Sequence, residues 1–207
     1  MRGRFITLEG GEAVGKSTQA RRLAAALRQR GIDLVETREP GGSAGAEAIR
    51  ALLLGGEVDR WGAAAEALLF AAARSDHVSR TIRPALEAGQ WVLCDRFVDS
   101  SIAYQGIVGG IGEDRIRALH AVGSGGLLPD RALLLQLEAA EAADRMSRRD
   151  GLNPDRFGAR DAGYHRAVNR AFAALAQQEP DRIRTVDALG AQEEVTRRLV
   201  GELEDLL

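Results

Sequence analysis

The residues whose types and spacing best suit chemistry form the segment Gly-Gly-Glu-Ala-Val-Gly-Lys-Ser at positions 10–17. It matches the pattern G-x-x-x-x-G-K-[ST], in which glycines allow successive backbone N–H groups to turn toward a phosphate. Lys16 is expected to reach the β- and γ-phosphates of a nucleoside triphosphate, and Ser17 to bind Mg²⁺. The alternative is a glycine-rich turn with an accidental lysine. The residues expected to bind the triphosphate are Gly10, Gly11, Glu12, Ala13, Val14, Gly15, Lys16, Ser17 and Thr18.

The use of lysine in this chain supports a chemical role for this segment. The sequence has 28 basic residues, and Lys16 is the one lysine among them. An ammonium group is a compact charge on a flexible stem, and a planar guanidinium cannot replace it in a tight pocket. A chain otherwise restricted to arginine therefore keeps its lysine where the chemistry needs one.

A second candidate lies where an apolar run ends in an acid. Residues 91–94 read Trp-Val-Leu-Cys and are followed by Asp95 and Arg96. An acid at the end of a buried strand can hold the Mg²⁺ of a bound triphosphate, directly or through water. Arg96 would then point into a crevice that already holds phosphates, where a guanidinium suits a second phosphate group, that of an acceptor.

The elements that must position these residues are predicted from an alternation of strand and helix patterns. Strands are expected at residues 5–8, 34–37, 91–94, 131–137 and 183–186. Helices are expected at residues 17–30, 44–54, 63–88, 113–122, 139–148, 161–178 and 190–206. The alternation predicts an α/β fold with a five-stranded parallel sheet flanked by helices, in which ligands bind at the carboxyl ends of the strands. The phosphate-binding segment at 10–17 makes this fold one of the P-loop NTPase type.

Two segments do not fit this alternation and are candidate functional loops. Residues 106–112 are rich in glycine, and residues 148–160 combine charges with Gly151, Pro154 and Gly158. The second segment is predicted to be exposed and mobile.

Composition limits the possible classes of protein. The 207 residues fit a single domain, and a net charge of −2 gives no overall basic surface for nucleic acid. No apolar run approaches the roughly 20 residues of a membrane span, so a cytoplasmic protein is expected. The lone cysteine, Cys94, leaves no internal disulfide and is expected to pack in a strand.

Further along the chain the residues resemble the thymidylate kinase family over nearly the whole length. The quoted segments are Thr-Arg-Glu-Pro-Gly-Gly at 37–42, Leu-Leu-Phe-Ala-Ala-Ala-Arg at 68–74, Asp-Arg-Phe-Val-Asp-Ser-Ser-Ile-Ala-Tyr-Gln-Gly at 95–106 and Asp-Arg-Phe at 155–157. The resemblance implies transfer of the γ-phosphoryl group of Mg·ATP to dTMP, giving dTDP and ADP. It also implies a homodimer and a lid at about residues 145–160. The apolar face of the alanine-rich helix expected at residues 63–88 could form the dimer contact, or it could pack in the core.

The resemblance assigns roles residue by residue. Phe70 would lie against thymine, Arg74 would donate to a thymine carbonyl, and Tyr104 would crowd the 2′ position of the sugar. As alternatives, Phe70 is a core residue and Arg74 a solvated one. Residues 39–40 resemble a segment with a cis peptide bond. The residues assigned to dTMP are Glu12, Arg38, Pro40, Arg50, Phe70, Arg74, Arg96, Ser101, Tyr104 and Gln105.

Glu12 is unusual because a carboxylate in a phosphate-binding loop repels the triphosphate. The resemblance implies that it faces the 3′-hydroxyl of the acceptor, and that positive charge for the donor comes from elsewhere, since Ala13 follows it. Candidates are Arg145, Arg148, Arg149, Arg156 and Arg160, of which Arg145 and Arg149 are assigned to ATP, although any of them could be a solvated surface charge. The residues assigned to catalysis are Lys16, Arg96, Glu12 and Arg149.

The chain departs from the family pattern at Ala73 and Gly158, where acids are usual, and Asp76 and Asp161 are the candidates to compensate. An acceptor phosphate is already ionised, so no general base is required and the three histidines are expected to be packing or surface residues. Two other functions stay open. One is a kinase for dUMP, dCMP or a deoxynucleoside, and the other is a nucleotide-binding switch, against which the absence of an N-K-x-D element counts.

Overall fold

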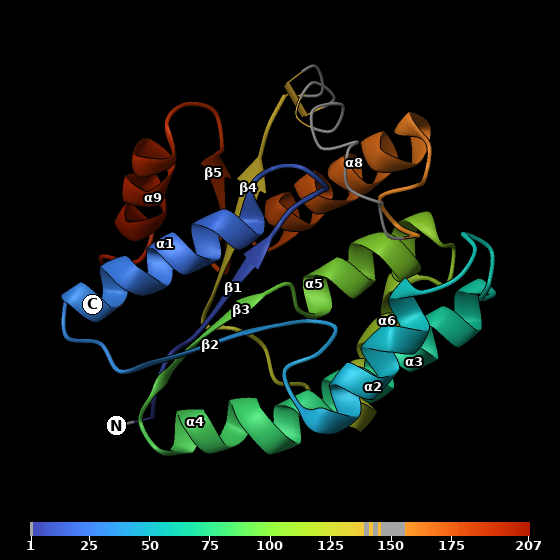
Figure 1. Ribbon diagram of the computed structural model, residues 1–207, viewed down its shortest axis with the longest axis horizontal. Coiled ribbons are helices and arrows are strands. Elements are labelled where there is room, and N and C mark those ends of the chain that lie inside the picture. Colours follow the sequence, from blue (N-terminus) through green and yellow to red (C-terminus); the bar gives the residue numbers. More distant parts are fainter. Residues whose placement is uncertain (1, 139–140, 143–144, 146–155) are drawn as a thin grey trace.

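The computed structural model describes residues 2–138, 141–142, 145 and 156–207. Five parallel strands form one sheet in the order β2-β3-β1-β4-β5 (Figure 1). The strands are β1 (Phe5–Glu9), β2 (Leu34–Arg38), β3 (Trp91–Asp95), β4 (Arg131–Gln136) and β5 (Ile183–Asp187). All five predicted strands are confirmed, with bounds that differ by one residue at their carboxyl ends.

The central strands are buried on both faces, as their continuous apolar runs require. Because side chains alternate along a strand, Phe5 of β1 belongs to the core on one face and Ile6 and Leu8 to the core on the other. Val92 and Leu93 divide β3 in the same way. Helices must therefore cover both faces of the sheet.

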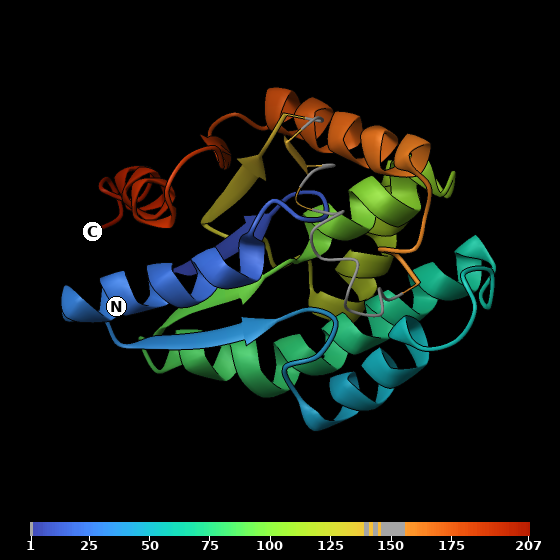
Figure 2. The same cartoon turned by 45° about the horizontal axis from the view of Figure 1, so that its top comes forward.

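Two groups of helices provide this cover (Figures 1 and 2). Helices α1 and α9 pack together on the face that carries Ile6 and Leu8, and the remaining helices lie on the opposite face or beyond the carboxyl ends of the strands. The helices are α1 (Lys16–Gln29), α2 (Ala44–Leu54), α3 (Ala63–His77), η1 (Val78–Ile82), α4 (Arg83–Glu87), α5 (Val98–Ser101), η2 (Ile102–Val108), α6 (Glu113–Ser124), α8 (Ala162–Gln178) and α9 (Gln192–Gly201).

The predicted helix at residues 63–88 contains a change of helical type. The chain stays helical from Ala63 to Glu87, but Val78–Ile82 forms a π-helical segment. Pro84 directly follows this π-helical segment, so its missing N–H falls where the helical hydrogen-bonding pattern changes. The proline therefore shifts the helical register instead of ending the helix.

The prediction of a glycine-rich loop at residues 106–112 is wrong for its first three residues, which are helical. Helix α5 and the π-helical segment η2 run from Val98 to Val108, and Gly106 is buried within η2. Serines, β-branched residues and glycine have low helix propensity, so the sequence did not predict this helix. Packing of η2 against α8 and α6 stabilises it instead.

The segment at 148–160 was predicted to be exposed, but two of its described residues are not. Arg156 and Phe157 are buried, and Arg156 forms an ion pair with Glu66 of α3. Arg148, Arg149 and most of the helix expected at 139–148 lie outside the described residues. Among the helices that the structure describes, none has the length and apolarity to cross a lipid bilayer.

Candidate active site

The phosphate-binding pattern forms the loop between β1 and α1, as its mechanism requires. Gly10 has φ 137°, and a Cβ there would lie 2.5 Å from the carbonyl oxygen of Leu135, so no other residue fits. Gly15 has φ 92° and immediately precedes α1, which begins at Lys16. Backbone N–H groups and the positive end of the helix dipole therefore converge on the loop.

Lys16 is buried inside this loop, and its ammonium donates a hydrogen bond to the carbonyl oxygen of Gly11 at 2.5 Å. Burial, with help from the nearby Arg96, lowers the pKa of Lys16 to about 8, although Glu12 and Asp95 oppose the shift. A bound triphosphate would supply the anionic partner that the ammonium needs.

Ser17, in the first turn of α1, lies beside Asp95 at the carboxyl end of β3. Asp95 ends β3, which pairs directly with β1, and its Oδ2 accepts a hydrogen bond from Ser17 Oγ at 2.8 Å. The other oxygen, Asp95 Oδ1, is buried and has no hydrogen-bond partner among the described residues. A hydroxyl and a carboxylate with an unused oxygen are the ligand types that protein sites give Mg²⁺, which takes further ligands from substrate phosphates.

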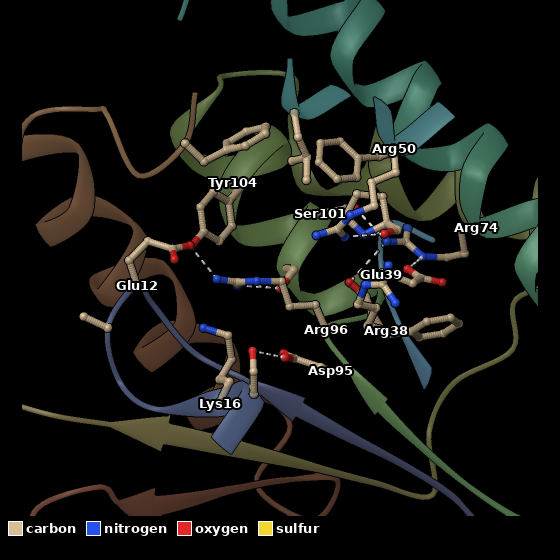
Figure 3. Close-up of a pocket in the computed structure, with 18 of the residues that line it drawn as sticks. Glu12, Lys16, Arg38, Glu39, Arg50, Arg74, Asp95, Arg96, Ser101 and Tyr104 are labelled. Carbon is tan, nitrogen blue, oxygen red and sulfur yellow. Dashed lines mark hydrogen bonds and ion pairs between the residues drawn. The ribbon is translucent and has the colours of Figure 1, made fainter. Parts of the chain in front are cut away.

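Arg96 occupies the centre of the site (Figure 3). Its guanidinium donates to Glu12 at 2.6 Å, to the carbonyl oxygen of Gly10 at 2.8 Å and to Ser100 Oγ at 3.2 Å, and it lies over the ring of Tyr104. The backbone of Arg96 has φ 69°, a conformation that costs free energy for a residue with a side chain. The surrounding contacts thus fix the direction in which the guanidinium points.

Glu12 is held in its charged form. It accepts hydrogen bonds from Arg96 and from the Tyr104 hydroxyl, the latter at 3.0 Å. Burial alone would raise its pKa, but the charges of Arg96 and Lys16 and the bond from Tyr104 lower the pKa to about 2. The carboxylate therefore stays ionised at neutral pH.

Glu9 helps to position Arg96 indirectly, through Ser100. The carboxyl group of Glu9 is buried and accepts hydrogen bonds from the Phe97 backbone N–H at 2.8 Å and from Ser100 Oγ at 2.6 Å. Ser100 in turn accepts from Arg96. Burial, with the nearby charge of Asp99, raises the pKa of Glu9 to about 8.

This raised pKa predicts a pH dependence of stability. The folded protein binds a proton at Glu9 more tightly than the unfolded chain, so Glu9 contributes stability at low pH that is lost as pH rises through about 8. Glu9→Gln copies the protonated form and removes this dependence. Between about pH 5 and pH 8 we expect the free energy of unfolding of the wild type to fall by a few kcal/mol relative to the variant. Urea unfolding across that range measures it; parallel pH profiles would contradict the assignment.

The groups around Lys16 and Arg96 form one cluster of charged side chains. A second cluster lies around Arg74 of helix α3, at the other end of the site. Arg74 is buried and donates from Nε to Glu39 at 2.7 Å and from Nη2 to Ser101 Oγ at 2.9 Å. Glu39 also bonds to His77. Glu39, which belongs to one of the quoted family segments, is the acid that pairs with Arg74. Neither Asp76 nor Asp161 does so, because Asp76 accepts from Ser43 and Asp161 caps α8.

The loop after β2 carries the other expected acceptor residues. Arg38 pairs with Glu47 of α2 at 3.0 Å, and Arg50 donates to the carbonyl oxygen of Pro40. The Glu39–Pro40 peptide bond is cis, as the resemblance implied. Arg38 and Arg50 lie beside Arg74 at this end of the site, whereas Arg96 points toward Glu12 and Tyr104 (Figure 3).

One cavity of about 620 Å³ joins the two clusters. Most residues expected at the site line it: Glu12, Ala13, Gly15, Lys16, Ser17, Thr18, Arg38, Pro40, Arg50, Phe70, Arg74, Asp95, Arg96, Ser101, Tyr104, Gln105 and Arg145. Gly10, Gly11 and Val14 do not line it, and Arg149 lies outside the described residues.

Sequence reasoning missed several residues that build this site. Glu39 and Phe157 line the cavity, and both were visible only as members of quoted segments without roles. Glu9 and Glu66 lie behind the lining and hold Ser100 and Gln105. Acids at these positions carry no sequence signal of their own, because their partners are distant in the chain.

The histidines and Cys94 are placed largely as expected. Cys94 is buried in β3, and burial raises the pKa of its thiol well above the usual value. His77 is buried between Glu39 and Thr37, and His120 is buried beside Phe97. None of these groups is placed to take a proton from an acceptor phosphate.

A phosphate loop with its lysine, a neighbouring strand that ends in aspartate, and an arginine-rich acceptor region in the same cavity define a P-loop nucleotide kinase. The sequence profile of the family described as thymidylate kinase matches residues 8–199. The chain is 65% identical over 207 residues to a thymidylate kinase of Rhizorhabdus wittichii, with all of both chains covered. It is 48% identical over 196 residues to one from Bradyrhizobium sp., covering 94% of this chain and 87% of that protein.

A crystal structure of thymidylate kinase from Ehrlichia chaffeensis is similar, with a TM-score of 0.79 and 28% identity over 99% of this chain and 100% of that one. The chain belongs to the thymidylate kinase family. It is an ATP-dependent dTMP kinase, and ATP and dTMP are its substrates.

Proposed function

We propose that the two ends of the cavity divide the reaction, with Mg·ATP at the phosphate loop and dTMP between α3 and η2. The observation that carries this proposal is the continuity of the cavity from Lys16 to Phe70. A cavity with a phosphate loop at one end and an aromatic ring with paired polar groups at the other can align two nucleotides for in-line transfer.

At the donor end, Lys16 and the backbone N–H groups of the loop hold the β- and γ-phosphates. Ser17 and Asp95 hold Mg²⁺, and the unused buried oxygen of Asp95 supports this assignment. Bound there, Mg²⁺ supplies charge neutralisation for the phosphates. Arg145 lines the same cavity and adds positive charge to the donor; Arg149 keeps its assignment from the sequence alone.

At the acceptor end, Phe70 stacks against thymine, Arg74 donates to a base carbonyl and Gln105 reaches the base edge. Arg38, Arg50 and Arg96 gather around the dTMP phosphate, whose oxygen is already ionised and attacks without a general base. Tyr104 lies against the sugar. Glu12 accepts from the 3′-hydroxyl, and its low pKa supports this role because an ionised carboxylate can only accept.

The experiment that tests this placement is Phe70→Leu, which keeps an apolar side chain and removes the ring. Stacking of a base on an aromatic ring is worth about 1–3 kcal/mol, so we expect the KM for dTMP to rise about ten-fold. The KM for ATP should change less than about two-fold, because Phe70 lies at the other end of the cavity. Initial rates of ADP release give both constants.

The second part of this test compares different acceptors with the wild-type enzyme. Rates with dTMP, dUMP, dCMP, dGMP, thymidine ribonucleotide and no acceptor report which acceptor the site selects. A KM for ATP that rises as much as that for dTMP in Phe70→Leu would remove Phe70 from the base site. ADP release that does not depend on the acceptor would remove the acceptor site altogether.

The metal assignment predicts the behaviour of Asp95→Asn. Asparagine keeps the shape and the bond from Ser17 but loses the charge, so the Mg²⁺ concentration for half-maximal rate should rise about ten-fold or more. The rate at saturating Mg²⁺ should recover in part. Titration with Mg²⁺ at fixed ATP measures the effect; an unchanged midpoint would exclude Asp95 as a metal residue.

Two further features remain proposals from the family resemblance. The 207 residues form one nucleoside monophosphate kinase domain in which the segment at about 145–160 acts as a lid. Two copies form a dimer, which the exposed Leu52, Leu68 and Val122 on α2, α3 and α6 support as apolar surface. Analytical ultracentrifugation of the wild type tests the dimer directly.

A further inference from the structure

The described end of the 148–160 segment is tied to the acceptor site by a buried ion pair. Glu66 of α3 and Arg156 have side chains that are 8% and 1% exposed, and their Oε2 and Nη2 atoms lie 2.9 Å apart. Arg156 also donates to the carbonyl oxygens of Leu53 and Val58. Both charges are thus partnered inside the protein, as buried charges must be.

The second oxygen of Glu66 holds Gln105. Glu66 Oε1 accepts a hydrogen bond from the side-chain amide nitrogen of Gln105 at 2.8 Å, in a buried environment. A carboxylate accepts hydrogen bonds and cannot donate, so only the NH₂ end of the amide can face it. The reverse orientation would bring two oxygens together and leave both unsatisfied. Glu66 therefore determines which end of the Gln105 amide faces away.

The group that faces away is the amide oxygen of Gln105. Gln105 lines the same cavity as Phe70 and Arg74, and no donor among the described residues bonds to its amide oxygen. Arg74 is fixed by a carboxylate as well, that of Glu39, and is a donor only. The wall of the cavity thus offers an acceptor from Gln105 and a donor from Arg74.

We infer that Glu66 is a positioning residue that sets the hydrogen-bonding polarity of this wall and so selects a base with an N3–H donor. The inference rests on the proposed placement of the base against Phe70 and Gln105. Thymine and uracil present an N3–H donor beside the O4 acceptor, which complements the wall. Cytosine presents an N3 acceptor beside an amino donor, the reverse pattern, and leaves buried groups unpaired.

The variant that tests the inference is Glu66→Gln. Arg156 is a donor only and holds the oxygen of the new amide, so the NH₂ group of that amide faces Gln105 and forces the Gln105 amide to reverse. The ratio of kcat/KM for dTMP to that for dCMP should fall about ten-fold or more. The ratio for dTMP to dUMP should change less than about two-fold, because these bases share the same edge.

A second variant removes the charge that Glu66→Gln leaves unpaired. In the double variant Glu66→Gln/Arg156→Met both buried charges are gone, and the introduced amide accommodates either orientation of Gln105. The melting temperature should recover toward that of the wild type, whereas the dTMP to dCMP ratio should stay lowered. If Glu66 acted only on stability, Glu66→Gln would weaken all acceptors together and leave the ratio of kcat/KM for dTMP to that for dCMP unchanged.

The control removes the ion pair of a buried arginine far from the site, whose carboxylate partner is exposed. Arg131 at the start of β4 has a 7% exposed side chain and pairs with Asp205 at 2.7 Å. Arg131→Met/Asp205→Asn should lower stability and leave both acceptor ratios unchanged. The inference would be overturned if a folded Glu66 variant kept the wild-type ratio of kcat/KM for dTMP to kcat/KM for dCMP.

Gln105→Leu separates failure of the inference from failure of the proposed function. If Gln105→Leu leaves the dTMP to dCMP ratio unchanged, Gln105 does not read the base and the proposed placement of dTMP falls. If Gln105→Leu lowers the ratio and the Glu66 variants do not, the placement stands and only the role of Glu66 is excluded.

Discussion

Replacing Lys16 by alanine is expected to lower kcat by about a thousand-fold or more while the protein stays folded. The ammonium lies buried inside the phosphate loop, and its partner in the described structure is the carbonyl oxygen of Gly11. With ATP bound, no other group of the loop can place a positive charge between the β- and γ-phosphates. Charge that develops in the transition state would then go unneutralised.

The measurement is the rate of ADP release with saturating Mg·ATP and dTMP, with melting curves to verify the fold. Lys16→Arg is the matched variant, because it keeps the charge and changes its shape. A planar guanidinium does not fit a loop closed around an ammonium, so this variant should also be nearly inactive. Retention of more than about a tenth of the wild-type kcat by Lys16→Ala would contradict the assignment of the loop.

Loss of Arg96 is expected to lower kcat/KM for dTMP by about a thousand-fold. Its guanidinium is fixed by Glu12, the carbonyl oxygen of Gly10 and Ser100, so it is organised before the acceptor phosphate arrives. Arg96→Ala removes that charge and leaves Glu12 without its main partner. The apparent affinity for ATP should change far less, because Lys16 and the loop remain.

Thymidine separates a phosphate contact from a general structural role of Arg96. This nucleoside lacks the phosphate, so its inhibition constant should stay within a few-fold of the wild type in Arg96→Ala, whereas dTMP binding weakens strongly. Equal weakening of thymidine and dTMP would show that Arg96 acts only on the structure. Arg22→Ala is the matched control: this half-buried arginine pairs with the exposed Glu193 between α1 and α9, and such surface pairs contribute little.

The supporting carboxylates differ in how they act on the arginines of the site. Glu12 faces Arg96 directly, Glu9 reaches it through Ser100, and Glu39 holds Arg74. Each arginine is thus directed by an acid that is distant in sequence. A dTMP kinase gains from this arrangement because aligned charges, and not a proton transfer, lower the barrier to phosphoryl transfer.

The sequence by itself determined the elements with strong local signals. The five strands follow from apolar runs, and the phosphate loop follows from a pattern whose glycines and lysine have few other uses. Helix α2 at Ala44–Leu54 matches the predicted bounds, because Ser43 caps its start and Gly55 follows its end. Residues four apart on one helix, such as Phe70 and Arg74, could likewise be placed together.

Only the tertiary structure decided the elements and contacts that depend on distant partners. Helix α5 and segment η2 form against propensity, because burial against α8 outweighs the cost of their serines and glycine. Arg156 looked like an exposed charge in a loop and is buried against Glu66, which lies in a helix far earlier in the chain. Long-range pairing of charges leaves no periodic pattern in a sequence, so such partners become visible only when the chain is folded.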